Sequence, residues 1–297
     1  MATQTKDAFK ILHLDQNEPP KRITFLQRFV RNRRAVIGAF LLTSFCLIAV
    51  FAPSIAPFKA DEQNILDRLT EPNSTYIMGT DQLGRDIFSR AVYASRISIP
   101  IGVFAMFVAS TVGVSIGLIS GFYGGIIDNV LMRLTDMLLS FPVFFLLLTV
   151  TTLFGRTMFV LILILGLVSW GVVARVVRGQ VLMLKEREFV EAARSLGASN
   201  FGILVRHIFP NVLPIIIVDA TLRVALLILV EGGLSFLGVG IQPPTPSWGN
   251  MVAEGGALLR RAWWVSVFPG LFLFLCTMSF NLVGDGLRDA LDPHFKS

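Results

Sequence analysis

The sequence predicts an all-α membrane protein with about six transmembrane helices, because of its composition and the spacing of its charged residues. Hydrophobic residues make up 54% of the 297 residues, charged residues only 15%, and the mean hydropathy is +0.68. A soluble core of this length needs fewer apolar residues, so we expect the bilayer to surround much of the chain. Windows poor in charge recur along the chain, and each approaches the roughly 20 apolar residues that a spanning helix needs.

Each predicted span corresponds to one apolar window. The windows are residues 35–51, 97–127, 137–155, 157–174, 210–238 and 262–284. The second window is long enough for one span followed by a short turn at Tyr123, Gly124 and Gly125. Only a tight turn around Gly155 fits between the third and fourth windows. These windows predict six crossings.

The predicted spans divide the chain into five parts. They are an N-terminal tail (1–34), a first transmembrane helix (35–53), an extracytoplasmic loop (54–96), a five-helix core (97–290) with a cytoplasmic segment at 185–209, and a C-terminal tail (291–297). The N-terminal tail is too long and too charged for the start of a cleaved signal peptide, so the first apolar run is expected to remain as an anchor.

The distribution of Lys and Arg predicts the orientation. Both the N-terminal tail and the segment between the fourth and fifth spans are rich in these residues, which favours a cytoplasmic location for each. Six crossings then place the C-terminus in the cytoplasm as well. Residues 54–96 contain acidic and basic residues in balance, which indicates a folded extracytoplasmic loop. No nucleic-acid-binding motif accompanies the positive charge.

Small residues in the apolar windows are best explained by packing. Gly113, Gly117, Gly121 and Gly125 recur every four residues and would share one helix face, where they allow a second helix to approach closely. A substrate groove is the less favoured interpretation. The two cysteines, Cys46 and Cys276, lie in apolar runs and are expected to be hydrophobic packing residues without a disulfide.

The cytoplasmic segment predicts two short amphipathic helices joined by a turn. In the first helix, Phe189, Ala192, Ala193 and Leu196 fall at helical spacing. Gly197 follows where a left-handed residue would end this helix, and Ser199 or Asn200 can cap the next one. The second helix has apolar positions Phe201, Leu204, Val205 and Ile208. A partner protein that receives these faces in a groove is the simplest explanation of the segment.

The same segment resembles a known coupling element. Glu191, Ala192 and Ala193, followed by Gly197 and Pro210, look like the EAA loop of ABC importer permeases, which docks into a cleft of the cytoplasmic ATPase. The common loop has Ile and Leu where this chain has His207 and Phe209, and this departure resembles the variant of the dipeptide and oligopeptide group. The resemblance implies ATPase-coupling roles for Glu191, Ala192, Ala193, Gly197, His207 and Pro210. A metal-ligand role for His207 is disfavoured, because no second His or Cys lies beside it in the sequence.

Three further stretches resemble the second permease type of that group. They are residues 79–86, residues 234–249 and residues 281–293. The resemblance implies a type I ABC importer permease fold in the inner (plasma) membrane, with the first span packed peripherally. It also implies a heterodimer with a second permease, two ATPase subunits and an extracytoplasmic binding protein. Dipeptides and oligopeptides are the default substrates, and similar permeases carry nickel complexes, glutathione or sugars.

The sequence lacks the motifs of an enzyme. No G-x-x-x-x-G-K-[ST] loop is present, so ATP and Mg are expected in the partner ATPases, and we predict no catalytic residue, cofactor or metal in this chain. Residues 113–117 match the G-x-S-x-G pattern of serine hydrolases, but Ser115 lies in a predicted helix, and the histidines, His13, His207 and His294, lie outside the spans. An intramembrane hydrolase is therefore a remote alternative.

Two ionisable residues in the fifth window form a second candidate site. Asp219 and Arg223 are four residues apart and so share a helix face. Charged side chains at this depth usually face a bundle interior or an aqueous path. A pair beside the translocation path and a structural pair that holds the fifth span to a neighbour both remain open.

Overall fold

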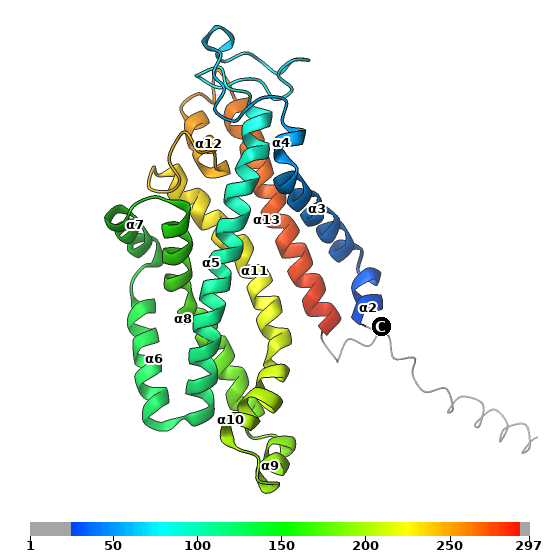
Figure 1. Cartoon of the computed structure of the whole chain (residues 1–297), viewed down its shortest axis with the longest axis vertical. Helices are drawn as coiled ribbons and strands as arrows, with labels where there is room; N and C mark the ends of the chain where they lie inside the picture. Colours follow the sequence, from blue (N-terminus) through cyan, green and yellow to red (C-terminus); the bar gives the residue numbers. More distant parts are fainter. Residues whose placement is uncertain (1–24, 292–297) are drawn as a thin grey trace, which may run out of the picture.

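The computed structural model describes residues 25–291, and their regular elements are helices apart from one isolated bridge between Thr80 and Asp86 (Figure 1). Five helices are long and apolar enough to cross a membrane: α3 (Arg33–Val50), α5 (Ile87–Tyr123), α8 (Met158–Leu184), α11 (Phe209–Phe236) and α13 (Trp264–Leu291). A sixth crossing is available if α6 (Gly125–Ser140) and α7 (Val143–Phe154) count as one bent span. The predicted all-α class with about six spans is confirmed.

The remaining helical elements are shorter. They are α2 (Phe25–Arg31), α4 (Ala52–Ile55), the 3₁₀ turn η1 (Ile65–Asp67), α9 (Glu188–Ser195), α10 (Asn200–Ile203), the π-helical turn η2 (Leu204–Ile208) and α12 (Trp248–Gly256). The long helices run roughly along the longest axis, with α9 and α10 at one end and residues 56–86 at the other (Figure 1). Predictions that concern residues 1–24 and 292–297, including His13 and His294, lie outside the described residues.

Two spans extend well beyond their charge-free windows. Helix α5 begins at Ile87 instead of residue 97, because the Asp86 side chain caps it by accepting a hydrogen bond from the Ser89 backbone N–H at 2.8 Å. Helix α8 continues past residue 174 to Leu184 and includes Arg175 and Arg178. The charged residues lie in the added turns of both helices, which a search for uncharged windows leaves out.

The third predicted span is not one straight helix. The chain breaks between α6 and α7, and the two helices are bent by 85°. Phe141 adopts extended backbone angles because the following residue, Pro142, disfavours a helical conformation in the residue before it. The predicted turns at Gly124 and Gly155 are present, with backbone φ angles of +65° and +99°.

The packing of α5 against α8 confirms the packing interpretation for three of the four glycines. A Cβ atom added to Gly113, Gly117 or Gly121 would lie 2.6 to 2.8 Å from α8 atoms. The α8 side chains at these contacts are Val173, Val177 and Val181. Gly125 was wrongly placed on this face, because Gly124 ends α5 and Gly125 begins α6 with open space around it.

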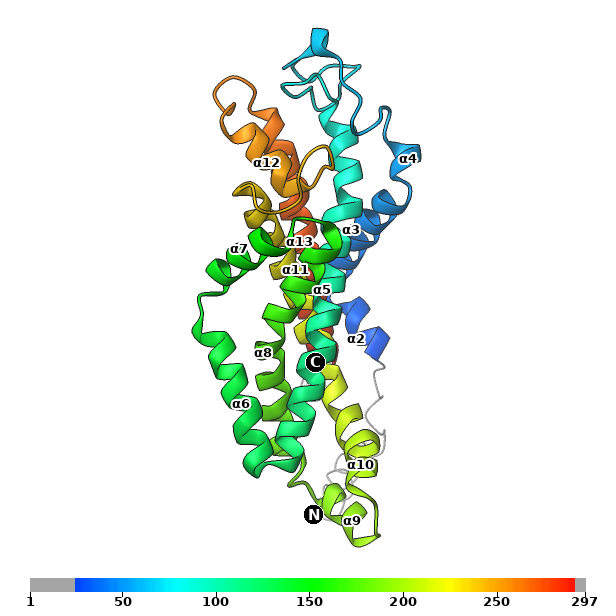
Figure 2. The ribbon, with the colours of Figure 1, turned by 60° about the vertical axis from the view of Figure 1, so that its left-hand side comes forward.

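The first span packs on α13 along one face. A Cβ added to Gly38 would lie 2.5 Å from the Leu282 Cβ, and a Cβ added to Gly286 would lie 2.2 Å from the Ala35 Cβ. Elsewhere on α3, side chains such as Phe40 are exposed. Both views place α3 beside α13 at the edge of the bundle (Figures 1 and 2). Cys46 of α3 and Cys276 of α13 are free thiols.

Replacing Gly117 with alanine is expected to destabilise the protein, because the new Cβ would lie 2.6 Å from the Ala174 carbonyl oxygen. Overpacking of this kind costs about 1–3 kcal/mol. The melting temperature of the detergent-purified protein should therefore fall. Gly179→Ala in α8 is the matched control, because no atom lies within 4 Å of its added Cβ. Unchanged melting of Gly117→Ala would show that this contact does not hold α5 to α8.

Candidate functional site

The predicted helix-turn-helix is present at the end of the molecule formed by α9 and α10 (Figure 2). Gly197 has a φ of +80° and ends α9. Its N–H donates to the Arg194 carbonyl at 3.0 Å, and the Ala198 N–H donates to the Ala193 carbonyl at 3.1 Å. These two bonds form the Schellman motif, which fixes the exit direction of the chain. Of the two proposed caps for the next helix, Ser199 is used, and its hydroxyl accepts from the Gly202 N–H at 3.1 Å.

Most of the apolar positions predicted for this segment are exposed. Val190 and Ala193 are buried, whereas Phe189 is 40% exposed and Leu196 is 87% exposed. Phe201, at the start of α10, is 70% exposed. Of the four apolar positions predicted for α9, only Ala193 is buried, and Val190 beside it anchors α9 to its own chain while the other apolar side chains are exposed. The turn thus presents apolar side chains that nothing in the described chain covers.

The remaining predicted coupling residues surround this turn. Glu191 and Ala192 are exposed on α9, and Pro210 is exposed in the first turn of α11. His207 lies in η2, and its carbonyl accepts a hydrogen bond from the Asn211 amide at 2.6 Å. Proline lacks an N–H and crowds the carbonyl four residues earlier, so the wide π-helical turn before Pro210 relieves a clash.

Asp219 and Arg223 form an ion pair on α11. The Arg223 Nε donates to the Asp219 Oδ2 at 2.6 Å, and the side chains are 23% and 22% exposed. Each charge therefore has its partner within the same helix. Both predicted roles stay predictions: a pair beside the translocation path, and a structural pair that holds the fifth span to a neighbouring helix.

A buried ion cluster at the other end of the molecule includes residues that the sequence analysis did not single out. The Asp81 Oδ2 accepts from the Arg85 Nε at 2.6 Å and from the Arg90 Nη1 at 2.5 Å. Glu254 of α12 accepts from Arg85 at 3.0 Å and from Arg90 at 2.7 Å. Asp81 and Arg90 are almost fully buried. Two basic and two acidic groups thus join the loop before α5 to α12 without net charge.

Asp86 lies beside this cluster. Its Oδ2 caps α5, while its Oδ1 is buried and has no hydrogen-bond partner. Burial raises the pKa of the Asp86 carboxyl, and hydrogen bonds from Ser89 act in the opposite direction. The Asp86 carboxylate therefore caps α5, although its burial removes water from the charged group and so disfavours the ionised form.

A second buried polar network centres on Glu231 of α11, which is fully buried. Its carboxylate accepts from the Ser235 hydroxyl at 2.7 Å and from the Ser98 hydroxyl of α5 at 3.3 Å. Ser98 in turn accepts from the Trp248 backbone N–H at 3.3 Å, and Ser235 accepts from the Ile241 N–H at 3.1 Å. One carboxylate thereby connects α5, α11, α12 and the chain between α11 and α12. Glu231 lies within the predicted span at residues 210–238, where no local sequence pattern indicates this network.

Residues 113–117, which match the G-x-S-x-G pattern of serine hydrolases, lie inside a helix. Ser115 lies within α5, and its hydroxyl donates to the Thr111 carbonyl at 2.7 Å. The strand-to-helix elbow that exposes a nucleophilic serine is therefore not formed here. Among residues 25–291, no group of three or more His, Cys, Asp or Glu is arranged to hold a metal ion.

The sequence matches known transport proteins over nearly its whole length. Residues 113–297 match the family of binding-protein-dependent transport system inner membrane components, and residues 23–72 match the N-terminal transmembrane domain of oligopeptide transport permease C. A dipeptide transport system permease protein from Alkalihalophilus pseudofirmus is 37% identical over 99% of this chain and 100% of its own length. A glutathione transport system permease protein from Pectobacterium atrosepticum is 40% identical over 92% of this chain and 91% of its own length. An oligopeptide transport system permease protein from Haemophilus influenzae is 40% identical over 90% of this chain and 86% of its own length.

Replacing Arg90 with glutamine is expected to destabilise the end of the molecule that holds residues 56–86, because Asp81 and Glu254 would then share only Arg85. Removing one partner of a buried ion pair costs about 3–5 kcal/mol. Thermal unfolding of the purified protein should therefore begin at a lower temperature. Arg96→Gln is the matched control, since Arg96 is exposed on the same helix and forms no ion pair with the described residues. Equal unfolding temperatures for both variants would contradict a stabilising role of the cluster.

Proposed function

Because the chain belongs to the family of inner membrane components of binding-protein-dependent transport systems, we propose that it forms half of the path through which an ATP-driven importer carries small peptides. The protein is a multi-pass permease subunit of an ABC importer, and the ATPase activity lies in its partner subunits. It works with an ATPase and with a binding protein. The names of the relatives support dipeptides, oligopeptides and glutathione as the substrate class.

The proposed assembly contains a second homologous permease and two ATPase subunits. Large apolar side chains remain exposed along the spans, for example Phe104 and Phe107 on α5 and Ile126 on α6. Such side chains require either lipid or another membrane protein as their neighbour. A second permease that covers part of this surface would complete a path that neither chain encloses alone.

The exposed turn between α9 and α10 is the observation that supports coupling to the ATPase. Leu196 and Phe201 project from two short helices whose relative angle is fixed by the Schellman bonds at Gly197. Apolar side chains on a preformed turn suit insertion into a groove of a partner protein. Glu191, on the outer surface of α9, is available for a charged contact with the same partner.

The structure of the fifth span suggests how motion of this turn reaches the membrane. Helices α10, η2 and α11 follow one another without a break, so residues Asn200–Phe236 form one long helical element. Movement of the turn would tilt this element as a unit. Glu231 holds its far end to α5 and α12 through the hydrogen bonds described above. The Asp219–Arg223 pair lies between the turn and this anchor, where a tilt would change its surroundings.

The coupling role also determines the proposed orientation. An ATPase that docks on α9 and α10 places this end in the cytoplasm, so residues 56–86 at the other end face the extracytoplasmic binding protein. Helix α2 and the end of α13 lie away from residues 56–86 (Figure 1). Both termini are therefore proposed to be cytoplasmic, in agreement with the Lys and Arg distribution.

Exchanging the charges of Asp219 and Arg223 is expected to reduce transport less than reversing either charge alone. The double variant Asp219→Arg with Arg223→Asp keeps two opposite charges four residues apart, so it should retain more ATP-dependent uptake than either single variant. Thermal stability should be measured on the same preparations. Loss of uptake at normal stability would support a position beside the path, whereas loss of stability would indicate a structural pair. Equal uptake defects in all three variants would argue against a functional pair.

Replacing Gly197 with valine is expected to uncouple transport from ATP hydrolysis. Valine is strained at a φ of +80°, at a cost of about 1–2 kcal/mol, which is small beside the insertion of the spans. Subunit abundance in the membrane should stay near normal, while ATPase co-purification and uptake of labelled dipeptide and glutathione into reconstituted vesicles should fall.

Gly197→Asn is the matched variant, because asparagine tolerates the left-handed conformation. It should retain most of the coupling that the valine variant loses. Because the ATPase is cytoplasmic, dependence of its binding on residue 197 also tests the orientation. Normal ATPase binding and uptake by Gly197→Val at normal abundance would show that this turn is not the coupling element.

A further inference from the structure

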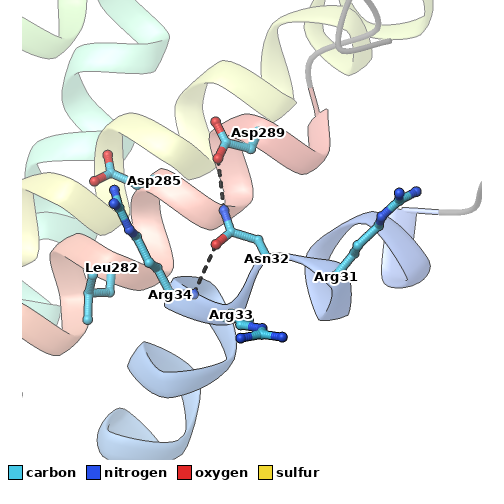
Figure 3. A pocket seen from close by; sticks show the side chains of 7 residues that line it. All are labelled: Arg31, Asn32, Arg33, Arg34, Leu282, Asp285 and Asp289. Carbon is cyan, nitrogen blue, oxygen red and sulfur yellow. Dashed lines mark hydrogen bonds between the residues drawn. The ribbon is translucent and has the colours of Figure 1, made fainter. Parts of the chain in front are cut away.

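A cavity of about 440 Å³ separates the start of α3 from the last turns of α13 (Figure 3). Its lining residues are Arg31, Asn32, Arg33, Arg34, Leu282, Asp285 and Asp289. Arg34 extends toward Asp285, and the Asn32 amide donates to the Asp289 Oδ2 at 2.9 Å (Figure 3). The α3 side of the cavity is therefore basic and the α13 side is acidic.

The charges that line this cavity have few partners within the chain. Among residues 25–291, no ion pair engages Arg31, Arg33, Arg34 or Asp285. The helix dipoles reinforce the two charged sides, because α3 begins here with its positive end and α13 ends here with its negative end. The Asn32 Oδ1 already accepts from the Arg34 and Ala35 N–H groups at 3.0 and 3.3 Å. An anion in this cavity would therefore depend on the guanidinium groups.

The length of α3 places the cavity at the depth of the lipid headgroups. Its 18 residues rise about 27 Å, close to the roughly 30 Å thickness of the hydrocarbon core. Residues just before the helix therefore lie at the membrane surface. Exposed Val36, Ile37 and Phe40 follow within the next two turns and can contact acyl chains. This combination of a charged cavity and a neighbouring apolar surface suits an amphiphile better than a free ion.

We propose that this cavity binds the headgroup of a phospholipid that carries both a phosphodiester and a primary ammonium, the chemistry of phosphatidylethanolamine. The guanidinium group of Arg34 binds the phosphate, as basic pockets between membrane helices do for other lipids. Asp285 and the free acceptor capacity of Asp289 take hydrogen bonds from the ammonium. A bound headgroup would bridge α3 and α13 and so hold the first span to the rest of the bundle.

The proposal predicts discrimination between headgroups. Phosphatidylglycerol offers the phosphate without a cation, and the trimethylammonium of phosphatidylcholine has no N–H to donate. The permease complex would be placed in nanodiscs with equal amounts of the three lipids, extracted mildly, and analysed by native mass spectrometry. Phosphatidylethanolamine should be retained in about tenfold excess over each of the others, as expected for one extra charge-assisted hydrogen bond. Equal retention of the three lipids would overturn the proposal without any variant.

Two substitutions separate the two halves of the site. Arg34→Gln should reduce retention of both phosphatidylethanolamine and phosphatidylglycerol, because it removes a phosphate ligand. Asp285→Asn should abolish the preference between these two lipids, because it removes the ammonium ligand. Arg260→Gln is the matched control, since it removes an exposed arginine between α12 and α13, at the other end of the molecule. Identical lipid retention by all three variants would contradict the assignment.

Inorganic phosphate distinguishes a lipid from a free ion as the source of the anion. Added phosphate at millimolar concentration should not displace the retained phosphatidylethanolamine, because the acyl chains also bind. Displacement of the lipid by phosphate alone, with the same sensitivity to Arg34→Gln, would instead assign the cavity to a free anion and reject the lipid.

Discussion

Close approach of helix backbones at glycine is the constraint on which the rest of this structure depends. Apolar side chains gain nothing by leaving lipid for another apolar surface, so helices in a bilayer associate mainly through van der Waals contact. Glycine appears at several of the helix crossings. Gly113, Gly117 and Gly121 bring α5 onto α8, Gly102 brings α5 onto Ile228 of α11, Gly284 brings α13 onto Leu222 of α11, and Gly38 brings α3 onto α13. Added Cβ atoms at these glycines would lie 2.8 Å or less from the neighbouring helix, so these contacts leave no room for larger residues.

Buried polar groups add the specificity that apolar packing in lipid cannot supply. The Asp81, Arg85, Arg90 and Glu254 cluster fixes the loop before α5 against α12, and Glu231 fixes α11 against α5 and α12. A buried charge without its partner is costly, so these pairings exclude other arrangements of the same helices. Both networks lie toward the end of the molecule that holds residues 56–86. The opposite end contains the exposed turn, and there Arg178 of α8 pairs with Asp128 of α6, which also accepts a hydrogen bond from Ser120 of α5.

Much of the fold follows from local sequence, and the predictions that were wrong failed for physical reasons. Windows poor in charge located the spans but truncated α5, because Arg96 and Arg90 are charged residues inside the helix, the first exposed and the second neutralised in part by Glu254, 164 positions away. The turn at Gly197 was predictable because a left-handed residue is determined by its own neighbours. That Val190 is buried on α9 and Leu196 is exposed was not predictable, because this choice depends on tertiary packing. The break at Pro142 had a local signal, but the composition on both sides of it is apolar enough for one continuous span.

The fifth span, α11, is held to its neighbours at one end and exposed at the other, and this difference determines how it can move. A helix transmits a displacement from one end to the other only if it does not bend and if its far end, here the end near Glu231, stays attached to its neighbours. The segment Asn200–Phe236 runs without a break, and it is buried at Val212 near its start and at Val224 and Ile228 in its second half. Its base is held by the hydrogen bonds that Glu231 accepts from the Ser235 and Ser98 hydroxyls, whereas its tip ends in a turn stiffened by two backbone hydrogen bonds. A force applied at the tip is therefore converted to a tilt about the base instead of being lost in local unfolding, and the wide turn η2 before Pro210 is the point where bending would begin if the force were too large.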